Sequence, residues 1–400
     1  MAAAMVIGCV VGLAYIYVGY PVMMWVLANL RARPVRKDTA PMGRQCSVVI
    51  SAYHEGASLS RKVESLFGST ALGSIREIII GFDGAPYEDD LTPETLAGIP
   101  IAWAERVSRD GRSIRVPEVR AIVFPERRGK AEVLNNLVSL ISSDILVMMD
   151  VRQEVHPKAI AELLANFADE RVGVVSGELV FWNKDDECRE GAAQQGVGFY
   201  WKYEKFIRRC EGRFRSVPGA TGALYAIRRK LFRPIPSGTL LDDVAIPMQA
   251  VVQGSRCVFE PAAMVYDVPS AMAVQEVLRK RRTIAGVVQL MHFYPEWLLP
   301  WRNPIWFEYV SHKLLRLASP ILLAGLFLFN LALLDRPWFL GLFVLQTLLY
   351  LSALMGMIGQ RKGWGAGCLG VPLMFVALNL TTALALWDAL RGRYNAAWKT

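Results

Sequence analysis

The chain has 400 residues, of which 53% are hydrophobic and 20% are charged. The apolar share excludes an ordinary soluble protein, and the charged share excludes a bundle buried wholly in a membrane, so the charges must gather in a soluble part. The net charge of +9 suits lipid headgroups, nucleotide phosphates or nucleic acid. The six cysteines show no CxxC spacing, which predicts unpaired thiols in a reducing compartment and no structural zinc.

The N-terminal segment predicts a membrane anchor over residues 1–32. Met5 to Leu30 is apolar apart from Asn29, and the ~20 residues needed to cross a bilayer fit inside it. The basic run RARPVRK follows at once. A cleavable signal peptide carries its positive charge before a shorter apolar core, so we interpret this segment as a retained anchor. By the positive-inside rule, the domain that follows faces the cytoplasm.

Residues 40–292 alternate apolar runs with segments of helical spacing. Near-continuous apolar runs are typical of strands buried on both faces of a parallel sheet. They cover residues 46–52, 76–82, 119–124 and 144–150. Helical spacing over 59–67 and 130–141 completes βαβ units. The segment 84–118 is richer in Pro, Gly and charge, and predicts an irregular excursion with one weak strand.

The second half of this domain continues the alternation. The expected helices cover residues 158–167, 194–210 and 242–252, and the expected strands cover 172–181, TGALYAIRR at 221–229 and RCVFEP at 256–261. The predicted fold class is therefore α/β, with a doubly wound, mostly parallel sheet. Ligands of such sheets lie at the carboxyl ends of the strands, where the loops diverge.

The last quarter of the chain predicts about three C-terminal transmembrane helices. A basic helix over 270–291 leads into an interfacial segment, 293–312, whose mixture of Trp, Pro and charge is typical of the headgroup level. Three apolar runs follow at 314–334, 338–358 and 367–387, each long enough to span, within a membrane region of 313–390. A basic tail, 391–400, ends the chain.

The charges beside these runs conflict with three full spans. If the domain is cytoplasmic, three crossings put Arg391, Arg393 and Lys399 on the far side, while Arg361 and Lys362 stay inside. One of the two groups then violates the charge bias. Either the bias is weak in this chain, or one apolar run is re-entrant.

Chemistry-bearing motifs gather where the strands end. They are SAYHE (51–55), GFDGA (81–85), RRGKAEVLNN (127–136), DVRQ (150–153) and LLDDVAIP (240–247), followed by RKRRTIAGVVQL (279–290) on a helix. A site for a nucleotide sugar needs such groups: polar groups for base and ribose, cations for the diphosphate, a carboxylate for a divalent metal, and a second carboxylate to take a proton from an acceptor hydroxyl.

With these motifs, residues 45–290 and the flanking apolar segments resemble the membrane-bound family 2 glycosyltransferases, which include cellulose, hyaluronan and poly-N-acetylglucosamine synthases. The resemblance implies a GT-A domain that transfers a sugar with inversion from a nucleotide-diphosphate sugar, expected to be a UDP-sugar. The acceptor is then a saccharide or lipid-linked molecule at the cytoplasmic face of the inner membrane. It further implies a role in exopolysaccharide or cell-envelope glycan synthesis, with membrane lipids and polysaccharide-export proteins as partners. Nucleic acid is not expected, because no helix-turn-helix or finger pattern occurs.

The resemblance assigns the donor-binding residues one by one. SAYHE resembles the family's P-x-Y-N-E loop, with Ser and His in place of Pro and Asn, which implies Ala52, Tyr53 and Glu55 near the nucleotide. Asp83 resembles the carboxylate that contacts the base, and Lys130 the cation of the G-K-A helix start.

The metal motif departs from the family pattern. Asp150 resembles the first acidic residue of D-x-D and is the implied ligand of Mg²⁺ or Mn²⁺, but Arg152 stands at the second acidic position. A divalent ion normally takes carboxylate oxygens, and a guanidinium can itself neutralise phosphate. Metal dependence is therefore left open, with Arg152 assigned to the donor site.

The acceptor side carries the expected catalytic carboxylates. Asp242 and Asp243 resemble the acidic pair that holds the family's general base, which we assign to Asp243 with Asp242 beside it. RKRRT resembles the Q-x-x-R-W motif, so Arg279 and Arg282 are expected at the diphosphate and acceptor. Thr283 replaces the Trp, which argues against a long-chain synthase.

Other interpretations stay open for the same residues. Asp150 can be a turn residue, the acidic pair can cap the helix that begins near Val244, and the basic cluster 279–282 can bind headgroups. Two other functions also remain: a polyprenyl-phosphate sugar transferase, and a catalytically impaired nucleotide-binding membrane protein.

Overall fold

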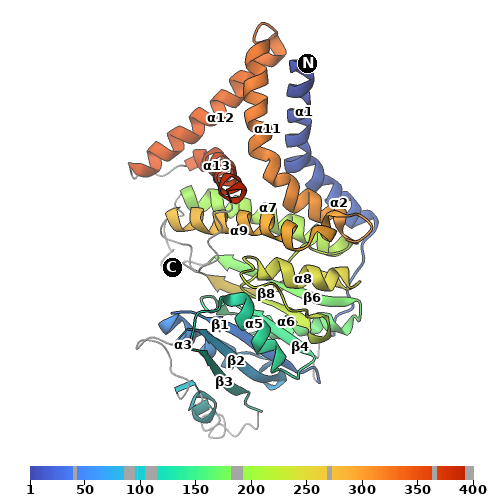
Figure 1. Ribbon diagram of the computed structural model, residues 1–400, viewed down its shortest axis with the longest axis vertical. Helices are drawn as coiled ribbons and strands as arrows, with labels where there is room; N and C mark the ends of the chain where they lie inside the picture. Colours follow the sequence, from blue (N-terminus) through green and yellow to red (C-terminus); the bar gives the residue numbers. More distant parts are fainter. Residues whose placement is uncertain are drawn as a thin grey trace.

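The computed structural model describes residues 1–38, 43–84, 95–96, 98–103, 115–181, 192–267, 273–362 and 367–391. An α/β domain lies at one end, a layer formed by helices α7 (Ala192–Phe214) and α9 (Ala273–Phe293) crosses above it, and long apolar helices extend from the other side of that layer (Figure 1). Of the segment 84–118, in which a weak strand is predicted, residues 95–96 and 98–103 are helical, while the remainder of 85–114 and most of the basic tail fall outside the described residues.

One eight-stranded sheet forms the centre of the α/β domain, in the order β3-β2-β1-β4-β7-β6-β8-β5. The strands are β1 (Cys46–Ala52), β2 (Ile75–Asp83), β3 (Glu118–Phe124), β4 (Ile145–Met149), β5 (Glu154–Val155), β6 (Val172–Phe181), β7 (Tyr225–Arg228) and β8 (Arg256–Asp267). The chain runs outward from β1 to β3 and then returns to place β4 on the other side of β1, parallel to it. This switch in direction between β1 and β4 opens the crevice in which ligands of such sheets bind.

The predicted sheet is confirmed, with a larger antiparallel share than the apolar runs suggest. Strand β7 is antiparallel to both of its neighbours, β4 and β6, and the short edge strand β5 is antiparallel to β8. Strands β6 and β8 are parallel. Because β7 is largely buried, as the parallel strands β1 and β4 are, its residue pattern does not reveal its direction.

Helices cover both faces of the sheet, which is why the central strands β1 and β4 are mostly apolar and buried along their length. Alternate residues of β1 enter two separate cores: Val48 and Ile50 lie with α3 (Gly56–Phe67) and α6 (Ala159–Ala165), and Val49 lies with α5 (Lys130–Ser139) and α8 (Asp242–Val252). A Cβ atom at Gly81 of β2 would lie 2.6 Å from Val133 Cγ1 of α5. The absent side chain therefore lets α5 pack directly on β2.

Helix α9 is fixed against the loop that leads into α8. A Cβ at Gly286 would lie 2.5 Å from Leu241 Cγ, so the helix backbone touches this loop closely. Gln289 accepts a hydrogen bond from the Leu240 amide (2.9 Å) and donates one to the Gly238 carbonyl (3.0 Å). These contacts set α9 directly beside the acidic pair.

Among the residues that the structure describes, four helices are long and apolar enough to cross a membrane, in agreement with the predicted one N-terminal and about three C-terminal spans. The first spans Ala2–Leu30 and consists of α1 (Ala2–Ala14), a π-helical turn (Tyr15–Gly19) and α2 (Tyr20–Leu30). The others contain α11 (Leu315–Asn330), α12 (Pro337–Arg361) and α13 (Gly370–Leu390). The second apolar helix is continuous from Trp306, so the end of the expected interfacial segment 293–312 is already helical.

Helix α13 lies against the α7–α9 layer. Whereas α11 leads away from that layer and α12 returns toward it, α13 packs on α9, α7 and α12 (Figure 1). Near its C-terminal end, Asp388 forms an ion pair with Arg281 of α9. The end of α13 is therefore held beside α9.

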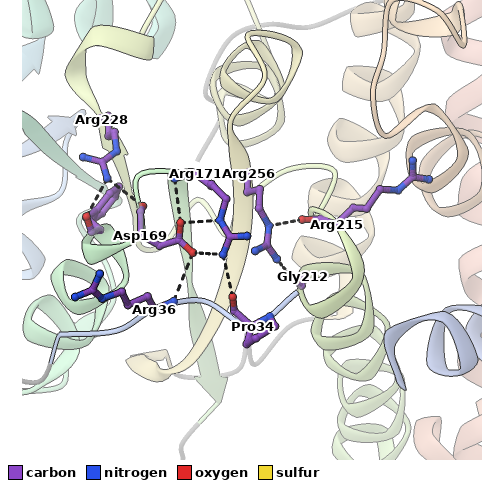
Figure 2. Close-up of polar contacts among 9 residues, drawn as sticks. Pro34, Arg36, Asp169, Arg171, Gly212, Arg215, Arg228 and Arg256 are labelled. Carbon is purple, nitrogen blue, oxygen red and sulfur yellow. Dashed lines mark hydrogen bonds and ion pairs between the residues drawn. The ribbon is translucent and has the colours of Figure 1, made fainter. Parts of the chain in front are cut away.

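The segment between α2 and the sheet is bound to the α/β domain through its backbone. The Arg36 amide donates to Asp169 Oδ2 (3.4 Å), and Arg171 donates to both Asp169 and the Pro34 carbonyl (2.7–3.2 Å), as Figure 2 shows. The Arg33 amide donates to the Arg213 carbonyl of α7 (2.8 Å). These bonds hold the first apolar helix in a defined position relative to the sheet.

Candidate active site

The sequence-predicted motifs meet at the carboxyl ends of β1, β2 and β4. Tyr53 follows β1, Asp83 is the last residue of β2, and Asp150 follows β4 directly. Helix α5 begins at Lys130 and α8 begins at Asp242, both beside these ends. The crevice expected from the strand order therefore contains the residues expected from the motifs.

Lys130 joins two of the predicted carboxylates. Its Nζ lies 2.8 Å from Asp150 Oδ1 and 2.9 Å from Asp242 Oδ2. Burial would lower the pKa of Lys130, but the two carboxylates outweigh that effect and raise it. Burial likewise opposes ionisation of Asp150, yet Lys130, with Arg152 and Arg282, holds the pKa of this carboxyl below its usual range. These shifts favour the charged forms of Lys130 and Asp150 at neutral pH.

Asp243 faces the same space as Asp150 but is not part of the bridge. A Cβ at Gly222 would lie 3.3 Å from Asp243 Oδ2 and 3.6 Å from Asp150 Oδ2, so both carboxylates border the surface that this glycine leaves open. Burial, and then repulsion from Asp242, raises the pKa of Asp243 to about 6. A carboxylate with a pKa near the working pH is suited to accept a proton as a general base.

The structure does not support the capping interpretation of the acidic pair. The N-cap of α8 is Leu241, and no side chain makes a cap hydrogen bond there. Asp242 and Asp243 are the first two helical residues, where the helix dipole favours negative charge. The carboxylate of Asp242 is directed to Lys130 instead.

Asp83 holds the basic turn that begins α5. Its carboxylate accepts hydrogen bonds from the amides of Arg128 (2.6 Å) and Gly129 (3.0 and 3.1 Å). Gly129 has φ +88°, which L side chains rarely adopt, so the glycine permits the turn. Asp83 thus helps to place Lys130, and its expected contact with the base stays a prediction.

The SAYHE loop lies beside this turn. The guanidinium carbon of Arg127 lies 4.0 Å from the centroid of the Tyr53 ring, a cation–π contact. Ala52 is buried at the end of β1, and the Glu55 carbonyl accepts the Ser58 amide (2.9 Å) at the start of α3. The roles of Ala52, Tyr53 and Glu55 in nucleotide binding stay predictions.

The basic residues of the motif on α9 have different surroundings. Arg282 is exposed, and its charge acts on Asp150. Arg281 instead forms the ion pair with Asp388 of α13, and the headgroup interpretation of the basic cluster stays a prediction. Arg279 lies on α9, and its side chain falls outside the described part of the structure.

Two residues of the site were missed by the sequence analysis. The Tyr225 hydroxyl of β7 is buried and has no hydrogen-bond partner among the described residues, and after burial the charges of the Asp242, Asp243 and Asp150 carboxylates raise its pKa well above the usual value. Lys62 of α3 is 1% exposed, and its ammonium likewise has no partner in the described part. No pattern marks Tyr225.

A signal for Lys62 is present in the sequence. It stands three residues after Leu59 and four before Leu66, which are both buried, so it interrupts the apolar face of a helix. A charged residue at such a position is either paired or functional, because an isolated buried charge is costly.

The side chains around Asp150 do not fit the ligand set of a divalent ion. Within the described ranges, no three His, Cys, Asp or Glu residues come together in a way that could hold a metal. Asp150 Oδ1 is occupied by Lys130, and the exposed guanidinium of Arg152 stands where a second carboxylate is needed. Oxygen ligands are what Mg²⁺ and Mn²⁺ require.

An α/β domain with paired carboxylates and cations at a sheet switch point, fixed to apolar helices, is the architecture of a membrane-associated glycosyltransferase. The family model of "Glycosyltransferase like family 2" matches residues 43–286, more than half of the chain. The chain belongs to this family, and the predicted family and enzyme class are confirmed. No curated protein matches the sequence at a significant level.

One solved structure confirms the GT-A fold. The mannosyltransferase PcManGT from Pyrobaculum calidifontis, in complex with GDP-Man and Mn²⁺, matches with a TM-score of 0.65 and 18% identity, over 97% of this chain and 99% of that chain. GalNAc-T7 with UDP, GalNAc and Mn²⁺ matches with a TM-score of 0.39 and 18% identity, over 67% of this chain and 54% of that chain. The second likeness is too weak to carry an argument.

Proposed function

We propose that this protein transfers a sugar with inversion from a nucleotide-diphosphate sugar to an acceptor at the membrane surface. The observation that carries the proposal is the pair of carboxylates over Gly222: Asp150, neutralised by Lys130, and Asp243, with its pKa raised to about 6. One carboxylate stands with the cations that a diphosphate needs, and the other is suited to take a proton. Family membership supports the same reaction.

The proposed mechanism is a single in-line displacement. Asp243 takes the proton from the acceptor hydroxyl as its oxygen forms a bond to the anomeric carbon. The bond between that carbon and the diphosphate oxygen breaks, and its electron pair leaves with the diphosphate. Lys130 and Arg282 stabilise the departing charge, and Asp150 and Asp242 position Lys130. For the Mg²⁺ or Mn²⁺ expected at Asp150, this position offers a single carboxylate ligand. The proposed displacement assigns its charge stabilisation to the cationic side chains and none to a metal ion.

A membrane-borne acceptor fits the position of Asp243. Tyr309, near the start of the second apolar helix, lies in the same hydrophobic core as Val244 of α8, the neighbour of Asp243 in the chain, and Leu314 packs against that core. The second apolar helix therefore shares a core with the helix that carries the proposed base. This supports a saccharide or lipid-linked acceptor delivered along the membrane, in exopolysaccharide or envelope glycan synthesis. Polysaccharide-export partners belong to the same proposal.

The experiment is a transfer assay with the full-length chain in membranes. Radiolabelled UDP-, GDP-, ADP-, CDP- and TDP-sugars are supplied, and the products are separated into lipid-linked, polymeric and free sugars. We expect transfer from one donor, with UDP expected from the resemblance and GDP from PcManGT as the contender. A product on polyprenyl phosphate would establish the alternative transferase, and absence of both transfer and donor hydrolysis would contradict the proposal.

We propose that the membrane is the inner membrane, that the α/β domain is cytoplasmic, and that α13 is re-entrant. Because the end of α13 pairs with α9, Arg361, Lys362 and Arg391 all come to the side of the α/β domain, as the charge bias requires.

Reporter fusions test this topology. Green fluorescent protein at the C-terminus is expected to fluoresce, and alkaline phosphatase there is expected to be inactive. Fusions at Asp335, between α11 and α12, serve as the control and should give the reverse result. An active C-terminal phosphatase would show that α13 crosses.

A further inference from the structure

Asp150 lies among four cationic side chains. Lys130 contacts it, and the charges of Arg152 and Arg282 also lower its pKa against burial. Lys62 is the fourth, and Asp150, Asp267 and Glu154 are the carboxylates whose charges act on its side-chain amine. These cations come from α3, α5, the end of β4 and α9, so the fold gathers positive charge at this one point from four separate segments.

The environment of Lys62 indicates an anionic ligand. The side chain is 1% exposed, its ammonium has no hydrogen-bond partner among the described residues, and burial lowers its pKa to about 7. Of its carboxylate neighbours, Asp150 is bound to Lys130 and Asp267 accepts from Gln153 Nε2 (2.9 Å). A buried ammonium without a hydrogen-bond acceptor costs free energy, and a bound anion would offset that cost.

A divalent ion is disfavoured at the same point. It would have to share Asp150 with the Lys130 ammonium, which lies at 2.8 Å, and stand beside the Arg152 guanidinium. Repulsion between like charges at such distances is strong in a partly buried site. The planar guanidinium of Arg152 can bind a phosphate through two hydrogen bonds, and unlike a metal ion it needs no carboxylate ligands to hold it in place.

From these contacts we propose that the protein binds the diphosphate of its donor with cationic side chains, with Lys130 and Arg152 at the phosphates and Lys62 as a further buried cation near Asp150, and needs no divalent ion. The inference rests on the proposed function for the identity of the ligand. Arg282, on α9, adds its charge from the membrane-facing side of the site.

The test measures nucleotide binding by the full-length chain in detergent, separately from turnover. The probes are UDP, GDP, ADP, CDP and TDP, each compared with its monophosphate so that the contribution of the second phosphate is isolated, in EDTA and in Mn²⁺. We expect one diphosphate to bind in EDTA at least about tenfold more tightly than its monophosphate, as charge-assisted contacts to phosphate would give. Mn²⁺ should change that affinity less than about threefold. Binding that requires Mn²⁺, or no binding by any probe, would overturn the inference.

Substitutions at Arg152 separate cation binding from metal binding. Arg152→Asp restores two acidic positions and is expected to weaken binding in EDTA by about tenfold or more and to regain it with Mn²⁺. Arg152→Gln should lose a similar amount and gain nothing from Mn²⁺. Unchanged binding by Arg152→Asp in EDTA would contradict the assignment.

Lys62→Met is expected to weaken diphosphate binding in EDTA by at least about threefold while leaving monophosphate binding unchanged, a difference that a purely structural lysine would not produce. Lys230→Gln, which removes an exposed cation, is the control and should bind as the wild type does. Equal affinities of Lys62→Met and wild type would remove Lys62 from the site.

The two proposals fail in different ways. Transfer that occurs only with Mn²⁺ would overturn this inference and leave the transferase proposal standing. Metal-independent binding of a diphosphate without transfer from any donor would support this inference and contradict the transferase proposal.

Discussion

Replacing Asp243 with Asn is expected to lower turnover by about 10²- to 10⁴-fold while the affinity for the nucleotide changes little. The amide keeps the shape of the side chain but cannot take a proton from the acceptor. Asp243 makes no described contact with the cations of the donor site, whereas Asp150 and Asp242 do. Turnover with the identified donor and nucleotide affinity, measured on the same preparation, give the two quantities.

The pH dependence identifies the base. Because the pKa of Asp243 is raised to about 6, the proton-accepting form predominates above pH 6, and the rate should fall as the pH drops through that value. Asp242→Asn removes a carboxylate whose repulsion raises this pKa, so its acid limb should move to lower pH. Asp144→Asn, at the opposite and exposed end of β4, is the matched control and should leave the profile unchanged. An acid limb near pH 6 that persists in Asp243→Asn would place the base elsewhere.

Replacing Lys130 with Met is expected to abolish most activity and to destabilise the protein. The change leaves the carboxylates of Asp150 and Asp242 without their bridging cation, and breaking a buried pair costs about 3–5 kcal/mol. Since the Asp150 side chain is 29% exposed, we expect about 3 kcal/mol, the lower end of that range. Thermal unfolding of the full chain in detergent, by loss of near-ultraviolet circular dichroism, is the measurement.

The pH dependence of this loss has a defined sign. Lys130 holds the pKa of Asp150 below its unfolded value of ~3.9, so the pairing stabilises the fold above that value and its contribution disappears as the pH falls through the lower folded pKa. The stability difference between Lys130→Met and wild type should therefore shrink toward acid pH.

The activity of the Lys130 variants gives a second readout. Lys130 also lowers the pKa of Asp243, so any residual activity of Lys130→Met should show an acid limb at higher pH than in wild type. Lys130→Arg keeps the charge and should recover much of the stability, with less of the activity because the guanidinium has a different shape. An unchanged melting temperature and acid limb in Lys130→Met would contradict the bridge.

Local patterns were sufficient for most of the strands and for the long helices, but the two-residue strand β5 was not predicted. The apolar run 46–52 coincides with β1, and 172–181 coincides with β6, because strands buried on both faces are mostly apolar along their length. The four apolar helices follow from length and composition alone. The motifs placed at strand ends are observed there, since a short apolar strand that stops at Asp83 or before Asp150 can only present that carboxylate at its end.

The sequence by itself thus determined the fold class, the family and the position of the candidate site. Only the tertiary structure decided how the pieces meet: that Lys130 joins Asp150 to Asp242, that Gly222 leaves room for Asp243 beside Asp150, and that α13 packs back on α9. The physical reason is the distance along the chain over which each effect acts. Burial and backbone propensity produce a periodic pattern in neighbouring residues. A salt bridge between distant segments, the direction of β7 and the contacts of Lys62 depend instead on packing between elements, which no local pattern encodes.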